Sequence, residues 1–213
     1  MISSILLAAG ESKRMEGENK LTKTIKDIPL IQYAIKNILG SAVDEIIIVV
    51  GHEKESLENI IEKNKKIKFV YNENFKTGIA SSIKVGLYNI SNKADAFFVC
   101  LGDMPDVNQN IYNKLIKARD NYNKKLKPIF KREIIIPSYE SRDGNPILFS
   151  TFMKKKLMHL KGDFGTREII ELNKKKTLNV PFDSEGILID FNTQESFENL
   201  QWLKSNACFW ISI

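Results

Sequence analysis

The sequence predicts one α/β domain of the Rossmann-like, doubly wound type, with a mostly parallel central sheet. Three apolar runs, each closely followed by a glycine, suit strands that are covered on both faces: residues 2–8, 45–50 and 96–101. Segments with apolar residues at helical spacing lie between these runs. Because strands alternate with helices, we expect right-handed crossovers and parallel neighbouring strands.

The first half of the chain shows this alternation most clearly. After the first strand, residues 30–39 have apolar side chains at helical spacing, and Gly40 follows where a C-cap is expected. The other elements predicted here are strands at 45–50, 67–71 and 96–101, a helix at 55–61, and a helix that begins near Ser81 or Ser82 and ends before Asp95.

The second half is less regular. Its predicted elements are helices at 111–119, 151–160, 166–173 and 194–205, strands at 133–137, 146–149, 176–180 and 186–190, and a turn at Asp143 and Gly144. No low-complexity linker interrupts the pattern, so we expect one domain over residues 1–205. Residues 206–213 form a tail of unknown role.

The composition is that of an ordinary folded protein, because 43% of the 213 residues are hydrophobic and 27% are charged. The net charge of +6 favours an anionic ligand such as a nucleoside triphosphate. The lysine runs at 154–156 and 174–176 suit solvated helix faces, so we expect no nucleic-acid partner.

Cys100 and Cys208 have neither zinc-site nor disulfide spacing, and we expect reduced thiols in a cytoplasmic protein. The apolar start is too short to span a membrane and lacks a basic leader region, so no membrane partner is expected.

Residues 6–21 form the first candidate site. The candidate nucleotide-binding residues are Leu7, Ala8, Ala9, Gly10, Ser12 and Lys13, and Arg14 and Lys20 add two further cations. The small residues allow the backbone to approach a base and its phosphates closely, while the cations neutralise much of a triphosphate's charge. The loop is neither a Walker loop nor GxGxxG, and the alternative is a glycine turn with solvated charges.

Residues 73–87 form a second candidate. Gly78 allows an unusual backbone turn, and Ser81 and Ser82 precede the apolar helix positions. A serine there can cap the helix, and the helix dipole can attract an anionic group. The alternative is a plain capped helix.

The third candidate is Asp103, which follows the apolar run 96–101. A carboxylate at the carboxyl end of a buried strand can bind Mg²⁺ through its oxygens, and Gly102 and Pro105 shape the turn that presents it. The alternative is an Asp-capped turn.

Two glycine-containing segments form concave backbone surfaces that suit a second ligand. Their candidate substrate-binding residues are Gly144, Asn145, Pro146, Gly165 and Arg167. Arg167 is expected to pair with Asp163, and its alternative is a charge on a surface helix.

Taken in order, these motifs resemble those of the MobA-like nucleotidyltransferases. The similarity lies in LAAG followed by Ser12, Arg14, Met15, Gly17 and Lys20, in LGDMP around Asp103, in GDFGTR at 162–167, and in Asp190 as the first carboxylate of the family's DIDTPED segment. Four positions depart from the family pattern: Glu16 is inserted before Gly17, Asn145 replaces a histidine, Asn192 replaces an aspartate and Gln194 replaces a proline.

The resemblance implies a fold of the nucleotide-diphospho-sugar transferase type and a Mg²⁺ ion on Asp103 and Asp190. It assigns Arg14, Lys20 and Asp103 to catalysis, and Gly78 with the two serines to the nucleotide. It also assigns the second glycine segments to a pterin acceptor.

The implied reaction is attack of a substrate phosphate on the α-phosphate of a nucleoside triphosphate, with loss of pyrophosphate. Family members with LAAG tend to use CTP, so Ala9 implies transfer of CMP to molybdopterin, and a molybdenum hydroxylase apo-enzyme is the expected recipient. The alternatives are a nucleotidyltransferase for sugar phosphates or other alcohol phosphates, and a non-catalytic protein that delivers the cofactor.

Overall fold

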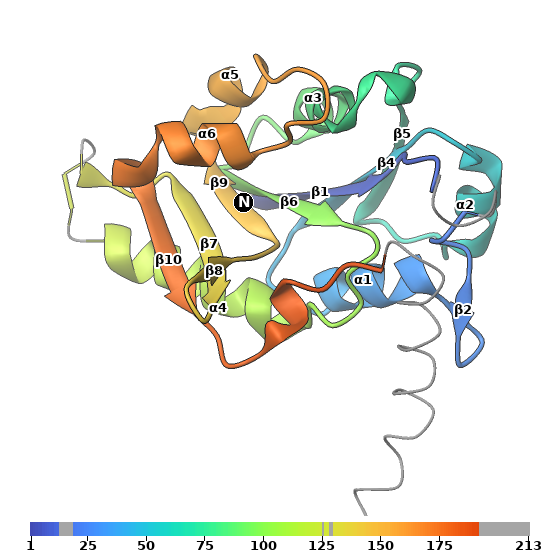
Figure 1. Cartoon of the computed structure of the whole chain (residues 1–213), viewed down its shortest axis with the longest axis horizontal. Helices are drawn as coiled ribbons and strands as arrows, with labels where there is room; N and C mark the ends of the chain where they lie inside the picture. Colours follow the sequence, from blue (N-terminus) through green and yellow to red (C-terminus); the bar gives the residue numbers. More distant parts are fainter. Residues whose placement is uncertain (13–18, 125, 128–129, 192–213) are drawn as a thin grey trace, which may run out of the picture.

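The computed structural model describes residues 1–12, 19–124, 126–127 and 130–191. Within these residues, an eight-stranded sheet lies between two layers of helices (Figure 1). The strand order is β10-β7-β9-β6-β1-β4-β5, and β8 pairs with β7. The strands are β1 (Ile2–Ala8), β4 (Glu45–Val50), β5 (Ile67–Tyr71), β6 (Ala96–Leu101), β7 (Ile134–Tyr139), β8 (Arg142–Asp143), β9 (Ile147–Ser150) and β10 (Thr177–Pro181).

The sheet is mostly parallel, as predicted. Strands β6, β1, β4 and β5 are parallel neighbours, and β7 and β10 form a second parallel pair. Strand β9 joins the two groups and is antiparallel to both β6 and β7. Because β1 and β6 are parallel neighbours, the loops after Ala8 and after Leu101 leave the same edge of the sheet.

The two faces of the sheet carry separate apolar cores. Alternating residues of each strand point to opposite faces, so Leu6 of β1 packs with α1 and α4, while Ile5 packs with α3, α5 and α6. Figure 1 shows α1 and α4 below the sheet, and α3, α5 and α6 above it. The helices are α1 (Leu30–Leu39), α2 (Lys54–Ile60), α3 (Ile79–Asn89), α4 (Gln109–Asn123), α5 (Lys154–Leu157) and α6 (Arg167–Leu172). None of the helices among the described residues is both long enough and apolar enough to span a membrane.

Short elements complete the fold. They are the two-stranded sheet of β2 (Thr24–Ile25) and β3 (Ile28–Pro29), and the 3₁₀ helices η1 (Phe75–Thr77), η3 (Thr151–Met153), η4 (Lys174–Lys176) and η5 (Glu185–Ile187). The helix predicted at 151–160 is shorter and is divided between η3 and α5. The predicted helix at 194–205 and the tail at 206–213 lie outside the described residues.

Three predictions about single elements were wrong: the start of a helix, the position of a turn and the type of one element. The helix expected from Ser81 or Ser82 begins at Ile79, so neither serine caps it. The turn expected at Asp143 and Gly144 lies instead at Glu140 and Ser141, whose φ angles of 48° and 66° suit the tight turn of the β7–β8 hairpin. The strand expected at 186–190 is η5 followed by irregular chain. Ile187 is buried in the core, and Leu188 and Ile189 are partly buried against it, without strand pairing among the described residues.

Candidate functional site

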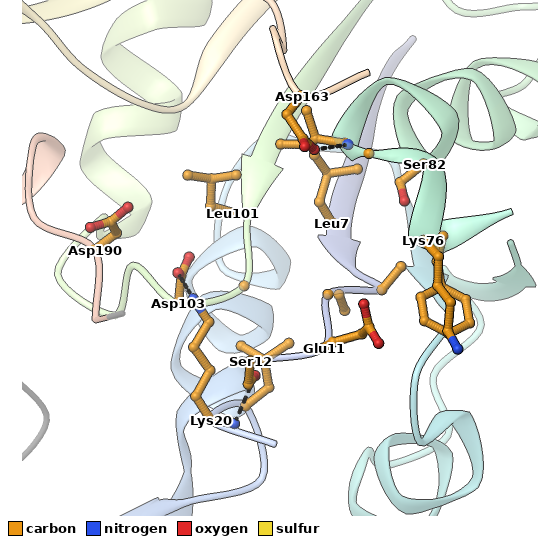
Figure 2. A pocket seen from close by; sticks show the side chains of 18 residues that line it. Leu7, Glu11, Ser12, Lys20, Lys76, Ser82, Leu101, Asp103, Asp163 and Asp190 are labelled. Carbon is orange, nitrogen blue, oxygen red and sulfur yellow. Dashed lines mark hydrogen bonds and ion pairs between the residues drawn. The ribbon is translucent and has the colours of Figure 1, made fainter. Parts of the chain in front are cut away.

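A cavity of about 500 Å³ opens at the carboxyl ends of β1 and β6 (Figure 2). Its lining combines residues that the sequence analysis assigned to a site and residues that it did not. The predicted lining residues are Leu7, Ala8, Ala9, Gly10, Ser12, Lys20, Gly78, Ser82, Asp103 and Asp190. The lining residues that sequence reasoning missed are Glu11, Leu21, Phe75, Lys76, Ile79, Leu101, Gly102 and Asp163. Lys13 and Arg14 lie outside the described residues.

The loop after β1 forms one wall of the cavity. A side chain built at Gly10 would meet no atom of the described residues within 4 Å, so among these residues the backbone is open to a ligand there. The Ser12 hydroxyl accepts a hydrogen bond of 3.1 Å from the Lys20 backbone N–H, which joins the two ends of the loop. The Gly102 N–H donates to the Leu7 carbonyl at 3.2 Å and links this wall to the end of β6. These two bonds connect Ser12 with Lys20, and the end of β1 with the residue after β6.

Lys20 and Asp103 form an ion pair at the floor of the cavity. Their side chains are only 17% and 9% exposed, so the pair is shielded from most of the solvent. Asp103 lies two residues after the end of β6, at the carboxyl end of this buried strand, where the sequence predicted it. Figure 2 shows the Lys20 side chain extended from the first loop to the Asp103 carboxylate.

Asp190 reaches the cavity through a series of backbone contacts. The Phe191 N–H donates to the Asp103 carbonyl at 3.2 Å, which places Asp190 beside the end of β6. Upstream, the Asn145 N–H donates to the Ile187 carbonyl at 2.8 Å. A side chain at Gly144 would lie 2.5 Å from the same carbonyl, so only glycine allows this approach.

The predicted substrate-binding residues Gly144, Asn145 and Pro146 lie outside the lining of this cavity. Gly144 and Asn145 contact Ile187 in the chain that carries Asp190. Their predicted contact with a second ligand stays a prediction.

The amino end of α3 is already occupied by protein groups. Its N–H groups at Ile79 and Ala80 donate to the Asp163 carboxylate at 3.2 Å and to the Gly162 carbonyl at 3.1 Å. Gly78 has φ = 109°, and a side chain there would lie 2.4 Å from the carbonyl carbon of Gly162. The expectation that this helix end attracts a ligand anion does not hold at these two N–H groups, because Asp163 and Gly162 bind them.

A buried asparagine organises the other side of the cavity. Asn72 is 1% exposed, and its amide donates to the hydroxyls of Ser81 at 2.8 Å and Ser82 at 2.9 Å. Its side-chain carbonyl accepts from the Asn74 N–H at 3.0 Å. Ser81 also donates to the Gly78 carbonyl at 2.8 Å and does not line the cavity, whereas Ser82 does. The position of Asn72 directly after β5 was the signal that could have identified it.

The two remaining predicted residues lie away from the cavity lining. Gly165 precedes α6 with φ = 56°, and Arg167 is exposed in the first turn of α6. The expected pair between Arg167 and Asp163 was wrong, since no ion pair joins them among the residues that the structure describes. Asp163 contacts Ile79 instead.

A model of the MobA-like NTP transferase domain matches residues 4–178. The chain belongs to this family. A probable molybdenum cofactor guanylyltransferase of Methanosarcina mazei is 25% identical over 219 residues, which cover 93% of this chain and 89% of that protein. The bifunctional protein GlmU of Caldicellulosiruptor saccharolyticus is 33% identical over 117 residues, covering 54% of this chain. This match spans 25% of that GlmU, and a match to the GlmU of Acetivibrio thermocellus spans 41% of its length.

Solved structures share the fold of this MobA-like chain. Rv0371c of Mycobacterium tuberculosis H37Rv superposes with a TM-score of 0.80 at 22% identity, covering 94% of this chain and 97% of that chain. A CMP:2-keto-3-deoxy-manno-octonic acid synthetase in complex with CTP gives a TM-score of 0.71 at 12% identity, covering 97% and 99% of the two chains. At these identities the similarity establishes the fold, which is that of the nucleotide-diphospho-sugar transferases.

The thiol of Cys100 is buried and unreactive. Cys100 lies in β6 with 1% exposure, and its sulfur contacts the Ser4 hydroxyl at 3.3 Å. Burial raises the pKa of the Cys100 thiol to about 12. The thiol therefore stays protonated at neutral pH and cannot act as a nucleophile.

Proposed function

We propose that this chain is a Mg²⁺-dependent nucleotidyltransferase that transfers CMP from CTP to the phosphate of a molybdopterin-type acceptor. The observation that carries the proposal is the position of Asp103 and Asp190 in one cavity with the glycine-containing loop after β1. A phosphate-binding backbone and two carboxylates are what a metal-bound triphosphate requires.

The residues present fit a magnesium ion. Asp103 and Asp190 offer hard oxygen ligands, and the bond from Phe191 N–H to the Asp103 carbonyl links their backbones. Mg²⁺ commonly takes one or two carboxylates from a protein and completes its coordination with phosphates and water. When bound there, Mg²⁺ supplies positive charge to the α- and β-phosphates.

The protein contributes to the reaction by positioning the triphosphate and by stabilising the negative charge that develops on it. The open backbone at Gly10 and the Ser12 hydroxyl bind and orient the triphosphate. An oxygen of the acceptor phosphate attacks the α-phosphorus and forms a new P–O bond. The bond between the α-phosphorus and the oxygen that bridges the α- and β-phosphates breaks, and pyrophosphate leaves. The Lys20 ammonium stabilises the negative charge that develops on these oxygens. The acceptor phosphate is already ionised, so no general base is required.

Relatives of the chain support two nucleotides. Ala9 in the first loop favours CTP through the resemblance to LAAG members of the family. Proteins named as probable molybdenum cofactor guanylyltransferases match the chain at 25% and 26% identity and favour GTP as the second candidate. In both cases the acceptor is a phosphate monoester, and delivery of the product to a molybdenum hydroxylase apo-enzyme is part of the proposal.

The deciding experiment measures pyrophosphate release with CTP, GTP, ATP or UTP in the presence of Mg²⁺ and molybdopterin. We expect release with CTP, and a loss of about 100-fold or more in Asp103→Asn, the size of effect seen when one charge-stabilising group is removed. Asp143→Asn is the control, because Asp143 is an exposed carboxylate on β8 that binds Asn179 outside the cavity. Pyrophosphate release with GTP alone would show that the enzyme transfers GMP and not CMP. Tight CTP binding without release would reject catalysis and favour the delivery protein.

A further inference from the structure

The ammonium group of Lys20 binds the carboxylate that the proposed function assigns to the metal ion. It pairs with Asp103 Oδ2, and both side chains line the cavity. The two groups are 17% and 9% exposed, so solvent screens their attraction less than it would at the surface. A metal ion that approaches Asp103 must therefore compete with a cation that the protein already provides.

The position of Lys20 also brings its ammonium within the cavity that the triphosphate would occupy. The Lys20 backbone is joined to the phosphate-binding loop by the bond from its N–H to the Ser12 hydroxyl at 3.1 Å. The backbone can stay in place while rotations of the long side chain carry the ammonium from Asp103 towards the loop. Phosphate oxygens attract an ammonium as strongly as a carboxylate does.

We propose that Lys20 is a placeholder for the divalent cation. In the nucleotide-free protein it neutralises Asp103, and it transfers to the triphosphate when nucleotide and metal bind together. This inference rests on the proposed function. Two consequences follow: the nucleotide-free protein binds divalent metal weakly, and metal and nucleotide each raise the affinity of the other by the same factor.

The first test measures Mn²⁺ binding to the nucleotide-free protein by electron paramagnetic resonance of the free ion. Lys20→Met removes the ammonium but keeps the length of the side chain. We expect Mn²⁺ affinity to rise about tenfold, in line with the couplings measured between close charge pairs. Lys76→Met is the matched control, because Lys76 lines the same cavity while its ammonium lies 5.8 Å from the centre of the Phe75 ring. The control should change the affinity by about twofold or less, as expected for a screened charge.

The second test repeats the titration with saturating CTP. In the wild type, CTP is expected to raise Mn²⁺ affinity strongly, because the phosphates supply ligands and also attract Lys20 away from Asp103. In Lys20→Met this cooperative gain should be smaller by about tenfold, the same factor by which the variant gains affinity without CTP. Asp103→Asn should remove the cooperative gain in both backgrounds.

The outcomes separate this inference from the proposed function. If Lys20→Met and a second variant, Lys20→Gln, fold by circular dichroism but bind Mn²⁺ no more tightly than the wild type, the placeholder role is wrong. An equal rise in Lys76→Met also overturns it, because the effect would then come from the general field of the cavity. In either case, CTP-dependent Mn²⁺ binding that Asp103→Asn abolishes would still support the proposed function. A wild type without any CTP-dependent Mn²⁺ binding would reject both.

Discussion

Gly78→Ala should affect both the stability of the protein and the shape of the cavity. Gly78 has φ = 109° and ψ = 168°, a conformation essentially restricted to glycine. The added methyl group would lie 2.4 Å from the carbonyl carbon of Gly162 and 2.7 Å from Asp163 Oδ1. The carbonyl oxygen of Gly162 would lie 2.5 Å away as well. Since both Gly162 atoms belong to the backbone, no rotation of a side chain can relieve these two contacts, and the loop at 162–163 has to move away from α3.

The expected cost has two parts. The backbone conformation contributes about 1–3 kcal/mol. Displacement of the loop removes the hydrogen bonds of the Ile79 and Ala80 N–H groups, each with a net contribution of about 1 kcal/mol. The total is about 3–5 kcal/mol, a large part of the roughly 5–15 kcal/mol by which a domain is stable. With a urea m-value of about 2–3 kcal/mol/M, the unfolding midpoint should fall by about 1–2.5 M.

Urea unfolding followed by circular dichroism measures this effect, with Gly165→Ala as the matched control. Gly165 also has a positive φ of 56°, but the nearest atom to an added methyl group is Ile79 Cγ2 at an ordinary 3.7 Å. The control should lose about 1–2 kcal/mol, the cost of a left-handed conformation alone. Equal midpoints for the two variants would refute the clash with the loop.

A double mutant tests the reasoning more closely. Asp163→Ala alone removes a capping carboxylate from α3 and should cost about 1 kcal/mol. If Gly78→Ala already displaces the loop, Asp163→Ala should cost almost nothing in that background, because the two changes break the same contact. Additive costs would show that the loop stays in place and that the strain lies elsewhere.

Three further predictions concern Asn72, Gly144 and Cys100. Asn72→Ala should lower the free energy of unfolding by about 2–4 kcal/mol, since three hydrogen bonds of a buried side chain are lost. It should also weaken CTP binding in calorimetry because Ser82 loses its partner; unchanged binding would show that the hydroxyl does not depend on Asn72. If the proposed function holds, Gly144→Ala should reduce pyrophosphate release about tenfold or more, because a displaced Ile187 carbonyl shifts the segment that carries Asp190 by the order of an ångström. Normal activity would contradict this role of the segment. Cys100, with a pKa raised from 9.0 to about 12, should resist alkylation at pH 8 in the folded protein when the other cysteine is serine. Its burial also favours folding below pH 9.0, and this contribution should be lost as the pH rises from 9.0 to about 12, because the unfolded thiol ionises first; a flat stability profile in a comparison with the alanine variant would contradict it.

The elements that the sequence predicted well are those whose pattern arises from local burial. Strands β1, β4 and β6 are covered on both faces, so their apolar runs are continuous and their bounds agree with the prediction. Helix α1 was predicted from residue 30 to residue 39 because one stripe of it packs on the sheet. Asp103 could be placed for the same reason, since a polar residue close to the carboxyl end of a buried parallel strand lies at the edge of the sheet where ligands bind.

The parts that could not be predicted depend on contacts between distant residues. Asp163 binds the N–H of Ile79, 84 residues away in sequence, and nothing local to GDFGTR indicates that partner. The run at 186–190 is apolar because Ile187 is fully buried, yet one hydrogen bond to Asn145 replaces a strand ladder. An apolar run alone does not distinguish these two ways of being buried. The antiparallel direction of β9 was equally invisible, because it depends on how the chain returns to the sheet.

The position of Asn145 gives its departure from the family pattern a specific meaning. Its backbone N–H binds the Ile187 carbonyl, and through that segment it supports Asp190, whose neighbour Phe191 binds Asp103. Any residue with a backbone N–H can make this contact, so the fold does not require a histidine or an asparagine at this position. Within the described residues, the Asn145 side chain makes no hydrogen bond of its own. The side chain at position 145 can therefore change from histidine to asparagine without loss of the backbone contact that supports the segment carrying Asp190.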